Sequence, residues 1–329
     1  MTNILISGGA GYIGSCLAHL LIEKKYKVTI IDNLATGYKY LIPKKAKFYK
    51  CDIANKKKII NILKKEKFDF LVHLAAFIKV EESVIFPKKY YLNNVIKSKN
   101  FIKICVDCGI KNIIFSSTAA AYKGSFISLS ERSEILPKSP YAKNKVEIEK
   151  YLKKISKKNN IKYFILRYFN VAGALKNLRS GQISKKSSHL INVLSEYIVG
   201  KRDKFYINGL DFPTKDRAAI RDFIDVNDLC NIHLLIIRKS KKLRSEIFNC
   251  GYGRGQSVLQ VFDTAKRIFS KNLRYYLRKR RKGDLVCSVA NVKKIKKFLG
   301  FKPTFDNLAN IIKSTVKWER KLLKSNLKF

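Results

Sequence analysis

Residues 1–15 read MTNILISGGAGYIGS, and this stretch decides how the first part of the chain folds. Its apolar part, Asn3–Ser7, is typical of a buried β-strand, and the residues that follow the glycines can form a helix. The glycines between them are Gly8, Gly11 and Gly14. Glycine lets the backbone turn sharply and approach a pyrophosphate, while the first N–H groups of a helix are unpaired and carry partial positive charge. The stretch therefore predicts a dinucleotide site.

An acidic residue follows at the spacing that such a site requires. Asp32 ends the next apolar run, Lys27–Ile31, and lies 18 positions (32 − 14) after Gly14. A carboxylate there can accept hydrogen bonds from the hydroxyls of an adenosine ribose. Dinucleotide binding is favoured over an ordinary strand–turn–helix junction, because the pattern combines a strand, a glycine turn, a helix and an acid after the second strand.

The length and composition restrict the class of protein. The chain has 329 residues, enough for two domains with sizeable cores. Residues 1–15 lack the basic start of a signal peptide, and no apolar run reaches the ~18 residues of a membrane span. The seven cysteines are scattered, and Cys105 and Cys108 predict packing thiols rather than a zinc or redox site. We therefore expect a cytoplasmic protein that needs no membrane and has no metal site.

The charge of the chain is unusual. Its 69 lysines and arginines exceed its 24 aspartates and glutamates by 45. Such an excess is typical of nucleic-acid-binding proteins, but these lysines are spread along the chain and form no single stripe. The abundant Ile, Asn, Phe and Tyr share A/T-rich codons with Lys, which favours a coding bias. We expect no specific nucleic-acid partner, and a basic surface that attracts anionic substrates.

Apolar runs alternate with amphipathic stretches through the first half of the chain. This alternation predicts an α/β fold of the Rossmann type, a doubly wound parallel sheet with helices on both faces. The further predicted strands are Lys47–Ile53, Phe70–Ala76, Asn112–Thr118 and Tyr163–Phe169, and the helices between them are Lys56–Lys67, Asn94–Cys108 and Tyr141–Lys158.

The alternation decays beyond residue 170, where shorter strands and loops carry Gly, Asn and Arg. This change predicts a smaller α/β lobe that closes over the cofactor. We expect one domain over residues 1–170 that binds the dinucleotide. A second domain over residues 171–329 would bind the substrate, with the chain crossing back to the first domain.

A second motif predicts proton transfer. Ser139 can cap a helix whose first residue is Pro140, which places Tyr141 and Lys145 one turn apart on one face. A tyrosine with its usual pKa of about 10 is a poor base at neutral pH. A lysine ammonium ~4–5 Å away, together with an oxidised nicotinamide, would lower that pKa. Thr118 ends a predicted strand and is placed to hydrogen-bond the oxygen being oxidised.

The glycine turn and the Tyr141/Lys145 motif are two of a series of short motifs that follow one another along the chain. The chain resembles the extended short-chain dehydrogenases/reductases and, within them, the UDP-glucose 4-epimerases. The resemblance runs from the first predicted strand to about Pro303. It rests on the stretches GGAGYIGS (8–15), DNLATG (32–37), DI (52–53), HLAAF (73–77), ESV (82–84), YYLNNV (90–95), FSST (115–118), PYAKNK (140–145), LRYFN (166–170), RDFIDV (221–226), FNCGYG (248–253) and RKGD (281–284).

The resemblance implies an enzyme that interconverts UDP-galactose and UDP-glucose with tightly bound NAD, and it leaves the N-acetylated pair open. Tyr141 would take the proton from the sugar O4 while the C4 hydride passes to NAD. The hydride would then return to the other face of the 4-keto sugar. Thr118 would hydrogen-bond O4, and Lys145 would tune Tyr141 and bind the nicotinamide ribose. The resemblance also implies a homodimer packed through the helices that follow Asn93 and Tyr141.

The same resemblance implies two sets of binding residues. The residues around NAD would be Gly8, Gly11, Tyr12, Ile13, Gly14, Asp32, Asn33, Leu34, Ala35, Thr36, Gly37, Asp52, Ile53, Leu74, Ala75, Ala76, Phe77, Ile78, Asn93, Thr118, Tyr141, Lys145 and Phe169. The residues that hold the UDP-sugar would be Asn170, Arg221, Arg281, Asp284 and Ser288, together with Thr118 and Tyr141.

Three positions depart from the pattern of the family. Ile78 stands where many members have a lysine, and Lys123 replaces a glycine in the loop after the catalytic threonine. Ser288 stands where some members carry a large tyrosine that faces the 2-substituent of the sugar. A small side chain at Ser288 leaves room for an N-acetyl group.

The residues around Thr118 also bear on other activities. A 4,6-dehydratase would need an acid pair directly after Thr118, where this chain has two alanines, so we reject that interpretation. UDP-glucuronate and UDP-xylose 4-epimerases stay open, because contacts to C6 cannot be read from the sequence. A non-catalytic protein that senses NAD or binds nucleic acid is a further alternative, against which the intact Thr118, Tyr141 and Lys145 argue.

Overall fold

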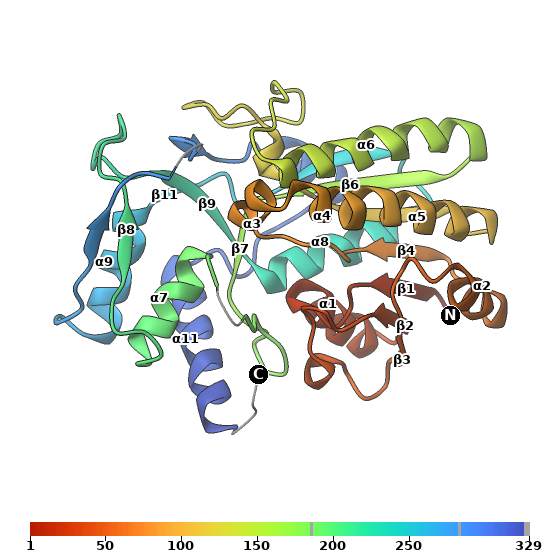
Figure 1. Ribbon diagram of the computed structural model, residues 1–329, viewed down its shortest axis with the longest axis horizontal. Coiled ribbons are helices and arrows are strands. Elements are labelled where there is room, and N and C mark those ends of the chain that lie inside the picture. The colour runs from red at the N-terminus through yellow and green to blue at the C-terminus, as the bar shows by residue number, and fades with distance from the viewer. Residues whose placement is uncertain (185–186, 282–283, 326–329) are drawn as a thin grey trace. The chain divides into compact units, whose positions relative to one another are not determined.

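The computed structural model describes residues 1–184, 187–281 and 284–325 (Figure 1). The chain forms two compact units that interleave along the sequence. The first, unit 1, consists of residues 1–122, 135–168 and 230–248, and unit 2 consists of residues 123–134, 169–229 and 249–329.

Unit 1 is built on a parallel sheet. Its strands are β1 (Asn3–Ser7), β2 (Lys27–Asp32), β3 (Lys47–Lys50), β4 (Phe70–His73), β5 (Asn112–Thr118), β6 (Lys162–Tyr168) and β10 (Glu246–Cys250), whose last two residues belong to unit 2. The seven strands run in the order β10-β6-β5-β4-β1-β2-β3. Five of these pairings are parallel: β1 with β2, β1 with β4, β2 with β3, β4 with β5, and β5 with β6.

Helices cover both faces of this sheet, and Figure 1 shows α5 and α6 on the side opposite to α1. The helical elements are α1 (Tyr12–Glu23), η1 (Lys39–Leu41), α2 (Lys56–Lys65), α3 (Val80–Ile85), α4 (Pro87–Tyr91), the π-helical η2 (Leu92–Lys97), α5 (Ser98–Asp107), η3 (Ala119–Ala121), α6 (Pro140–Asn159) and α8 (Val226–Lys239). Buried side chains of α2, α5 and α6 share one core with alternate strand residues such as Leu5, Ile113 and Ile165. The predicted doubly wound sheet is thereby confirmed.

Local signals in the sequence set the helix ends. The Ser139 side chain accepts a hydrogen bond from the Ala142 N–H, and Pro140 occupies the first turn, as the capping motif predicts. The helix ends at Asn159, and Asn160, which follows it, has a left-handed φ of 48°. Helix α6 therefore has a fixed start one residue before Tyr141.

Two predicted strands are longer than the strands observed. β3 ends at Lys50 rather than Ile53, because the Asp52 carboxylate accepts a hydrogen bond from the Ala54 N–H and turns the chain. β4 ends at His73 rather than Ala76. The released residues form loops at the carboxyl edge of the sheet, where ligands bind in folds of this kind.

Unit 2 is organised around one strand, β9 (Ile220–Asp225). It pairs in parallel with β7 (Asn170–Ala172) and β13 (Cys287–Ser288) and antiparallel with β11 (Gly255–Ser257). A separate parallel pair consists of β8 (Tyr206–Asn208) and β12 (Tyr276–Arg278), and the helices are α7 (Leu190–Ile198), α9 (Val258–Phe269), α10 (Lys293–Leu299) and α11 (Leu308–Lys324). In the part of the chain that the structure describes, no helix combines the length and apolar character needed to cross a membrane.

Candidate active site

The glycine turn after β1 has the close packing that a dinucleotide site needs. Gly8 has a φ of +79°, and a Cβ there would lie 2.6 Å from the Ala75 nitrogen. A Cβ on Gly14 would lie 2.3 Å from the Gly8 carbonyl oxygen, so α1 packs tightly against the turn. Among the described residues, no side chain caps the start of α1 at Gly11. The first N–H groups of α1 therefore offer a site for an anion such as a pyrophosphate.

The loop after β2 is fastened to this turn by Asp32. One carboxylate oxygen of Asp32 accepts from the Ala10 N–H at 3.0 Å, and the other accepts from the Leu34 N–H at 2.8 Å. Burial raises the pKa of Asp32, and the two backbone hydrogen bonds oppose that effect. Leu34 has a φ of 61°, which is rare for a bulky residue and is typical of strained functional loops.

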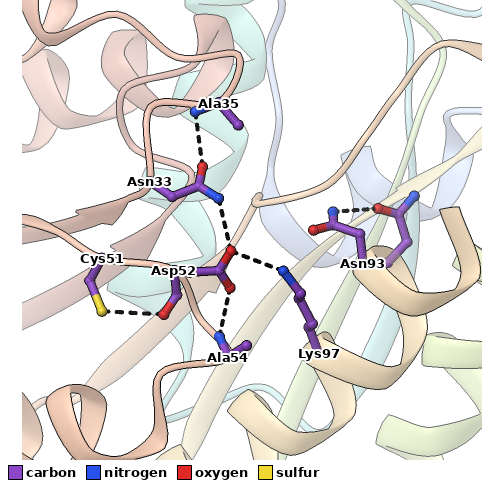
Figure 2. A network of polar contacts seen from close by, with 8 residues as sticks. Asn33, Ala35, Cys51, Asp52, Ala54, Asn93 and Lys97 are labelled. Atoms are coloured by element: carbon purple, nitrogen blue, oxygen red, sulfur yellow. Dashed lines mark hydrogen bonds and ion pairs between the residues drawn. The ribbon is translucent and has the colours of Figure 1, made fainter. Parts of the chain in front are cut away.

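A second carboxylate, Asp52, lies in a polar network at the same edge (Figure 2). Its Oδ2 accepts from the Asn33 side-chain amide at 3.0 Å and from Lys97 Nζ at 2.9 Å. Its Oδ1 accepts from the Ala54 N–H at 2.8 Å. Burial acts to raise the pKa of Asp52, but these hydrogen bonds outweigh it and lower the pKa. Asp52 therefore stays ionised with its oxygens held in place.

The loop after β4 is held by an asparagine pair on the π-helical turn η2. The Asn94 side-chain oxygen accepts from the Phe77 N–H at 2.8 Å, and its amide donates to the Phe77 carbonyl at 2.9 Å. The neighbouring Asn93 amide donates to the same Asn94 oxygen at 3.0 Å (Figure 2). Sequence reasoning named Asn93 and missed Asn94 and Lys97, although Lys97 follows Asn93 by one helical turn.

The catalytic trio predicted from the sequence comes together within unit 1. Thr118 ends β5, Tyr141 opens α6, and Lys145 follows one turn later on α6. The Thr118 side chain acts on the Tyr141 phenol and opposes the effect of burial on its pKa. Lys145 Nζ lies 6.0 Å from the centre of the Tyr141 ring. Thr118 and Lys145 are only 9% and 4% exposed. Tyr141 is only partly buried, so the three side chains form a polar cluster at the carboxyl end of the sheet in which the threonine and the lysine are enclosed.

Burial sets the protonation behaviour of this trio. It raises the pKa of Tyr141 to about 12, although the hydrogen bond from Thr118 opposes that effect. Burial also lowers the pKa of Lys145 to about 7. The protein's own groups therefore do not produce the predicted lowering of the Tyr141 pKa, because a low-dielectric site disfavours the charged form of both side chains.

Lys145 is held by the end of β5. Its Nζ donates to the Ser116 carbonyl at 2.7 Å and to the Ser116 hydroxyl at 3.2 Å. The Ser116 hydroxyl donates in turn to the His73 carbonyl at 3.2 Å. The His73 ring lies between the hydroxyls of Ser7 and Ser98, with contacts of 2.6 and 3.0 Å. A buried chain of polar groups thus connects Lys145 with the strand that precedes the glycine turn.

The residues predicted to hold UDP lie in unit 2, and most of them are neighbours there. Arg221 on β9 and Ser288 on β13 are register partners in the sheet. Asp284 lies 3.9 Å from Arg221 and 3.1 Å from Arg281. Asn170 lies on β7 and pairs with a different part of β9. Burial lowers the pKa of Arg221, and the charge of Asp284 opposes that effect.

The aspartate that follows Arg221 was quoted within a motif but given no role from the sequence. The buried Asp222 carboxylate accepts from the backbone N–H groups of Tyr252, Gly253 and Ala290, at 2.9, 2.8 and 3.1 Å. Burial raises the pKa of Asp222 to about 6. The carboxylate holds the loop after β10 and the chain after Ser288 in place beside Arg221.

Comparison with known proteins agrees with this geometry. Residues 4–251 match the NAD dependent epimerase/dehydratase family. The chain belongs to that family. Membership confirms the predicted resemblance and NAD as the cofactor, and the glycine turn, the uncapped start of α1 and the fixed Asp32 fit such a dinucleotide.

Relatives within the family extend over almost the whole chain. A UDP-glucose 4-epimerase of Lactobacillus helveticus is 37% identical over 321 residues, 97% of each protein. The solved structure of the UDP-Glc/GlcNAc 4-epimerase from Campylobacter jejuni is 39% identical, with a TM-score of 0.85, over 98% of this chain and 100% of that one. The structure of UDP-glucose 4-epimerase from Brucella ovis in complex with NAD is 31% identical, with a TM-score of 0.91, over 96% of this chain and 98% of that one.

Proposed function

We propose that this protein is a UDP-glucose 4-epimerase that interconverts UDP-galactose and UDP-glucose with NAD retained through turnover. The observation that carries the proposal is the cluster of Thr118, Tyr141 and Lys145, in which the threonine and the lysine are buried. Proton transfer beside a hydride transfer needs a group that can both take and return a proton at one sugar oxygen. A phenol held by a threonine hydroxyl, with a lysine behind it, is such a group.

The chain's own residues divide the work of the reaction. NAD supplies the chemistry of accepting and returning the hydride of sugar C4. Tyr141 takes the proton from O4 as the 4-keto sugar forms, and it returns that proton after the sugar has turned over. Thr118 donates to or accepts from O4 and orients it. Lys145, whose pKa is about 7, supplies or withdraws positive charge close to Tyr141.

The cofactor residues of the proposal are those at the carboxyl edge of the sheet in unit 1. The N-terminus of α1 would receive the pyrophosphate, Asp32 the adenosine ribose, and Asp52 the adenine side of the pocket. We also propose the domain roles predicted from the sequence, with residues 1–170 for NAD and residues 171–329 for the UDP-sugar. Phe169, predicted to contact NAD, belongs to unit 2.

Substrate binding is proposed for the cluster around β9. Arg221 and Arg281 can each bind phosphate bidentately or stack on a uracil ring. Asp284 lies close to both arginine side chains and would hold them near one another in the absence of the nucleotide. Asn170 and Ser288 complete the set, and the basic character of the chain favours an anionic nucleotide-sugar.

One assay tests the activity. Purified protein is incubated with UDP-galactose without added NAD, and the product is separated and identified. The proposal expects UDP-glucose to form until equilibrium, with dinucleotide recovered after denaturation of the protein. Absence of conversion in a sample shown to contain NAD would refute the activity. UDP-glucuronate and UDP-xylose in parallel reactions decide between the proposed substrate and the open alternatives.

Ser288 is the proposed determinant for the 2-substituent of the sugar. It is buried beside Arg221 in the sheet of unit 2, where a serine occupies little volume. We expect Ser288→Tyr to reduce kcat/KM for UDP-N-acetylglucosamine at least ~10-fold more than for UDP-glucose, because added bulk must clash with the larger substituent. An unchanged ratio of the two constants would discard this role.

We further propose that the protein is a homodimer. Consecutive elements α3, α4 and η2 expose large apolar side chains, among them Ile85 at 68%, Phe86 at 52% and Leu92 at 54%. Several large apolar side chains exposed within one short stretch of chain favour an interface between proteins. Analytical ultracentrifugation should give a dimer for the wild type and a monomer for Ile85→Lys/Leu92→Lys. A monomeric wild type at micromolar concentration would contradict the proposal.

A further inference from the structure

A buried ion pair lies directly behind the catalytic trio. Arg167 on β6 donates to the Glu149 carboxylate through Nε at 3.0 Å and through Nη2 at 2.6 Å. Both side chains are only 3% exposed. Burial acts to lower the pKa of Arg167, but the hydrogen bonds and charge of Glu149 outweigh it and raise the pKa. Arg167 therefore keeps its charge although it is buried.

The pair is tied to the segments on both sides of Thr118. The Ser117 hydroxyl, one residue before Thr118, donates to Glu149 Oε1. Four residues after Thr118, the Tyr122 hydroxyl accepts from Arg167 Nη1 at 2.9 Å, and the guanidinium lies 4.8 Å from the centre of the Tyr122 ring. Both ends of the segment that carries the threonine are thus attached to one ion pair.

The same pair is attached to the helix that carries the other two members of the trio. Glu149 follows Lys145 by four residues and Tyr141 by eight, so the three side chains follow one another along one face of α6. A rotation or slide of α6 would have to break the two hydrogen bonds between Glu149 and Arg167. The pair therefore fixes α6 relative to β5 and β6.

We propose that Glu149 and Arg167 are positioning residues of the epimerase reaction, which set the Thr118 hydroxyl against the Tyr141 phenol. This inference rests on the proposed function of the trio. Removing two charges from water costs free energy, and buried pairs can often be replaced by apolar residues without loss of stability. The pair is therefore better explained by the geometry it imposes than by the stability it adds, since a 1 Å displacement of a reacting group can cost ~10²-fold in rate.

The decisive variant removes both charges together. Glu149→Leu/Arg167→Met leaves no unpaired buried charge, and we expect it to fold with bound NAD. The expected result is a fall of ~10²-fold in kcat with KM for UDP-galactose changed less than ~3-fold. We also expect the acid limb of the kcat–pH profile to move to higher pH, because a looser contact with Thr118 lowers the Tyr141 pKa less.

Milder variants keep the inference testable if the double variant does not fold. Ser117→Ala and Tyr122→Phe each remove one hydroxyl that ties the pair to the segment of Thr118. We expect each to lower kcat by ~3- to 10-fold and their combination to lower it further. Glu147→Gln is the matched control on α6, because its carboxylate pairs with the partly exposed Lys99, away from the buried pair.

The outcomes separate this inference from the proposed function. Conversion of UDP-galactose by the wild type together with normal kcat and an unmoved pH profile in the folded variants would overturn the positioning role. An equal loss in Glu147→Gln would also overturn it, because the effect would then belong to α6 in general. A wild type that binds NAD and converts no UDP-galactose would refute the proposed function itself.

Discussion

Two regions at the carboxyl edge of the unit 1 sheet differ in whether their surroundings favour or disfavour the charged forms of their side chains. In one region Lys145 is enclosed and Tyr141 is partly buried, and burial moves both pKa values far from their usual range. The region of Asp52 and Lys97 is partly open, with side chains 33% and 26% exposed, and its ion pair keeps the carboxylate charged. Burial thus disfavours the charged form of the proposed proton-transfer residues, whereas hydrogen bonds favour the charged form of Asp52, which we propose to bind the cofactor.

The physical reason lies in the solvent. The pKa of a buried group depends strongly on the charges beside it. A charged cofactor can therefore bring the pKa values of a tyrosine and a lysine into the range where they exchange protons near neutral pH. A binding group at an open rim gains from staying ionised and oriented, and solvent screening keeps each contact modest. We therefore expect large effects from changes in the enclosed region and small ones at the rim.

The largest effect is expected for the proposed base. Tyr141→Phe removes the phenol oxygen and keeps the ring, so the fold and bound NAD should persist. We expect kcat to fall by ~10²- to 10⁴-fold, the usual contribution of a general acid or base. Turnover of UDP-galactose measures this, and Tyr151→Phe on the same helix is the control, since its hydroxyl donates to the Lys99 carbonyl and is not part of the proposed trio. Near-normal turnover of the Tyr141→Phe variant would remove Tyr141 from its role.

A smaller effect is expected at the rim. Lys97→Met breaks the ion pair with Asp52 and removes a positive charge near the expected adenine side of the pocket. Because partly exposed pairs contribute up to about 1 kcal/mol, we expect NAD to bind up to ~5-fold more weakly. Titration of nucleotide-free protein by calorimetry checks this.

The control for Lys97 lies two residues away. Lys99 forms an ion pair of similar exposure with Glu147, on α6. Lys99→Met should leave the affinity for NAD unchanged. Equal losses in the two variants would show that general charge, and not the orientation of Asp52, determines the affinity.

The remaining effect is on stability toward acid rather than on catalysis or binding, and it belongs to a buried histidine beside the proposed catalytic residues. Burial, aided by the charge of Lys145, lowers the pKa of His73 to about 3. Below about pH 6.5 the unfolded chain takes up a proton that the folded protein excludes, so the free energy of unfolding falls with falling pH. The contribution of this group is at most about 1.4 kcal/mol per pH unit.

Denaturant unfolding at several pH values between 4 and 7 tests the histidine. We expect His73→Asn to be less stable at pH 7, since the ring contacts with Ser7 and Ser98 are lost, but to show a shallower decline toward acid. A slope that His73→Asn leaves unchanged would assign the acid sensitivity to other groups.

Much of the site could be predicted because its signals are local in the chain. The glycine turn, Asp32 and the capped start of α6 are each determined by residues within one or two turns of each other. The resemblance supplied the roles of Thr118 and Lys145, and membership of the NAD dependent epimerase/dehydratase family confirms that resemblance. The individual roles stay predictions until the variants are measured.

The residues that sequence reasoning missed are those whose partners are distant in the chain. Lys97 meets Asp52 across 45 positions, and Glu149 meets Ser117 across 32. Glu149 had a signal, since it extends the spacing of Tyr141 and Lys145 by one more turn. Nothing in the sequence indicated which strand would face it.

The sequence by itself determined the parallel sheet, the glycine turn and the start of α6, because periodicity, capping and backbone freedom are local properties. The tertiary structure alone decided the pKa values of Tyr141 and Lys145, since burial depends on everything packed around them. It also decided that one ion pair, Glu149 with Arg167, holds both the threonine segment and the helix of the trio. Glu149 and Arg167 lie on different elements of the chain, so their charges interact only after folding has brought α6 and β6 together.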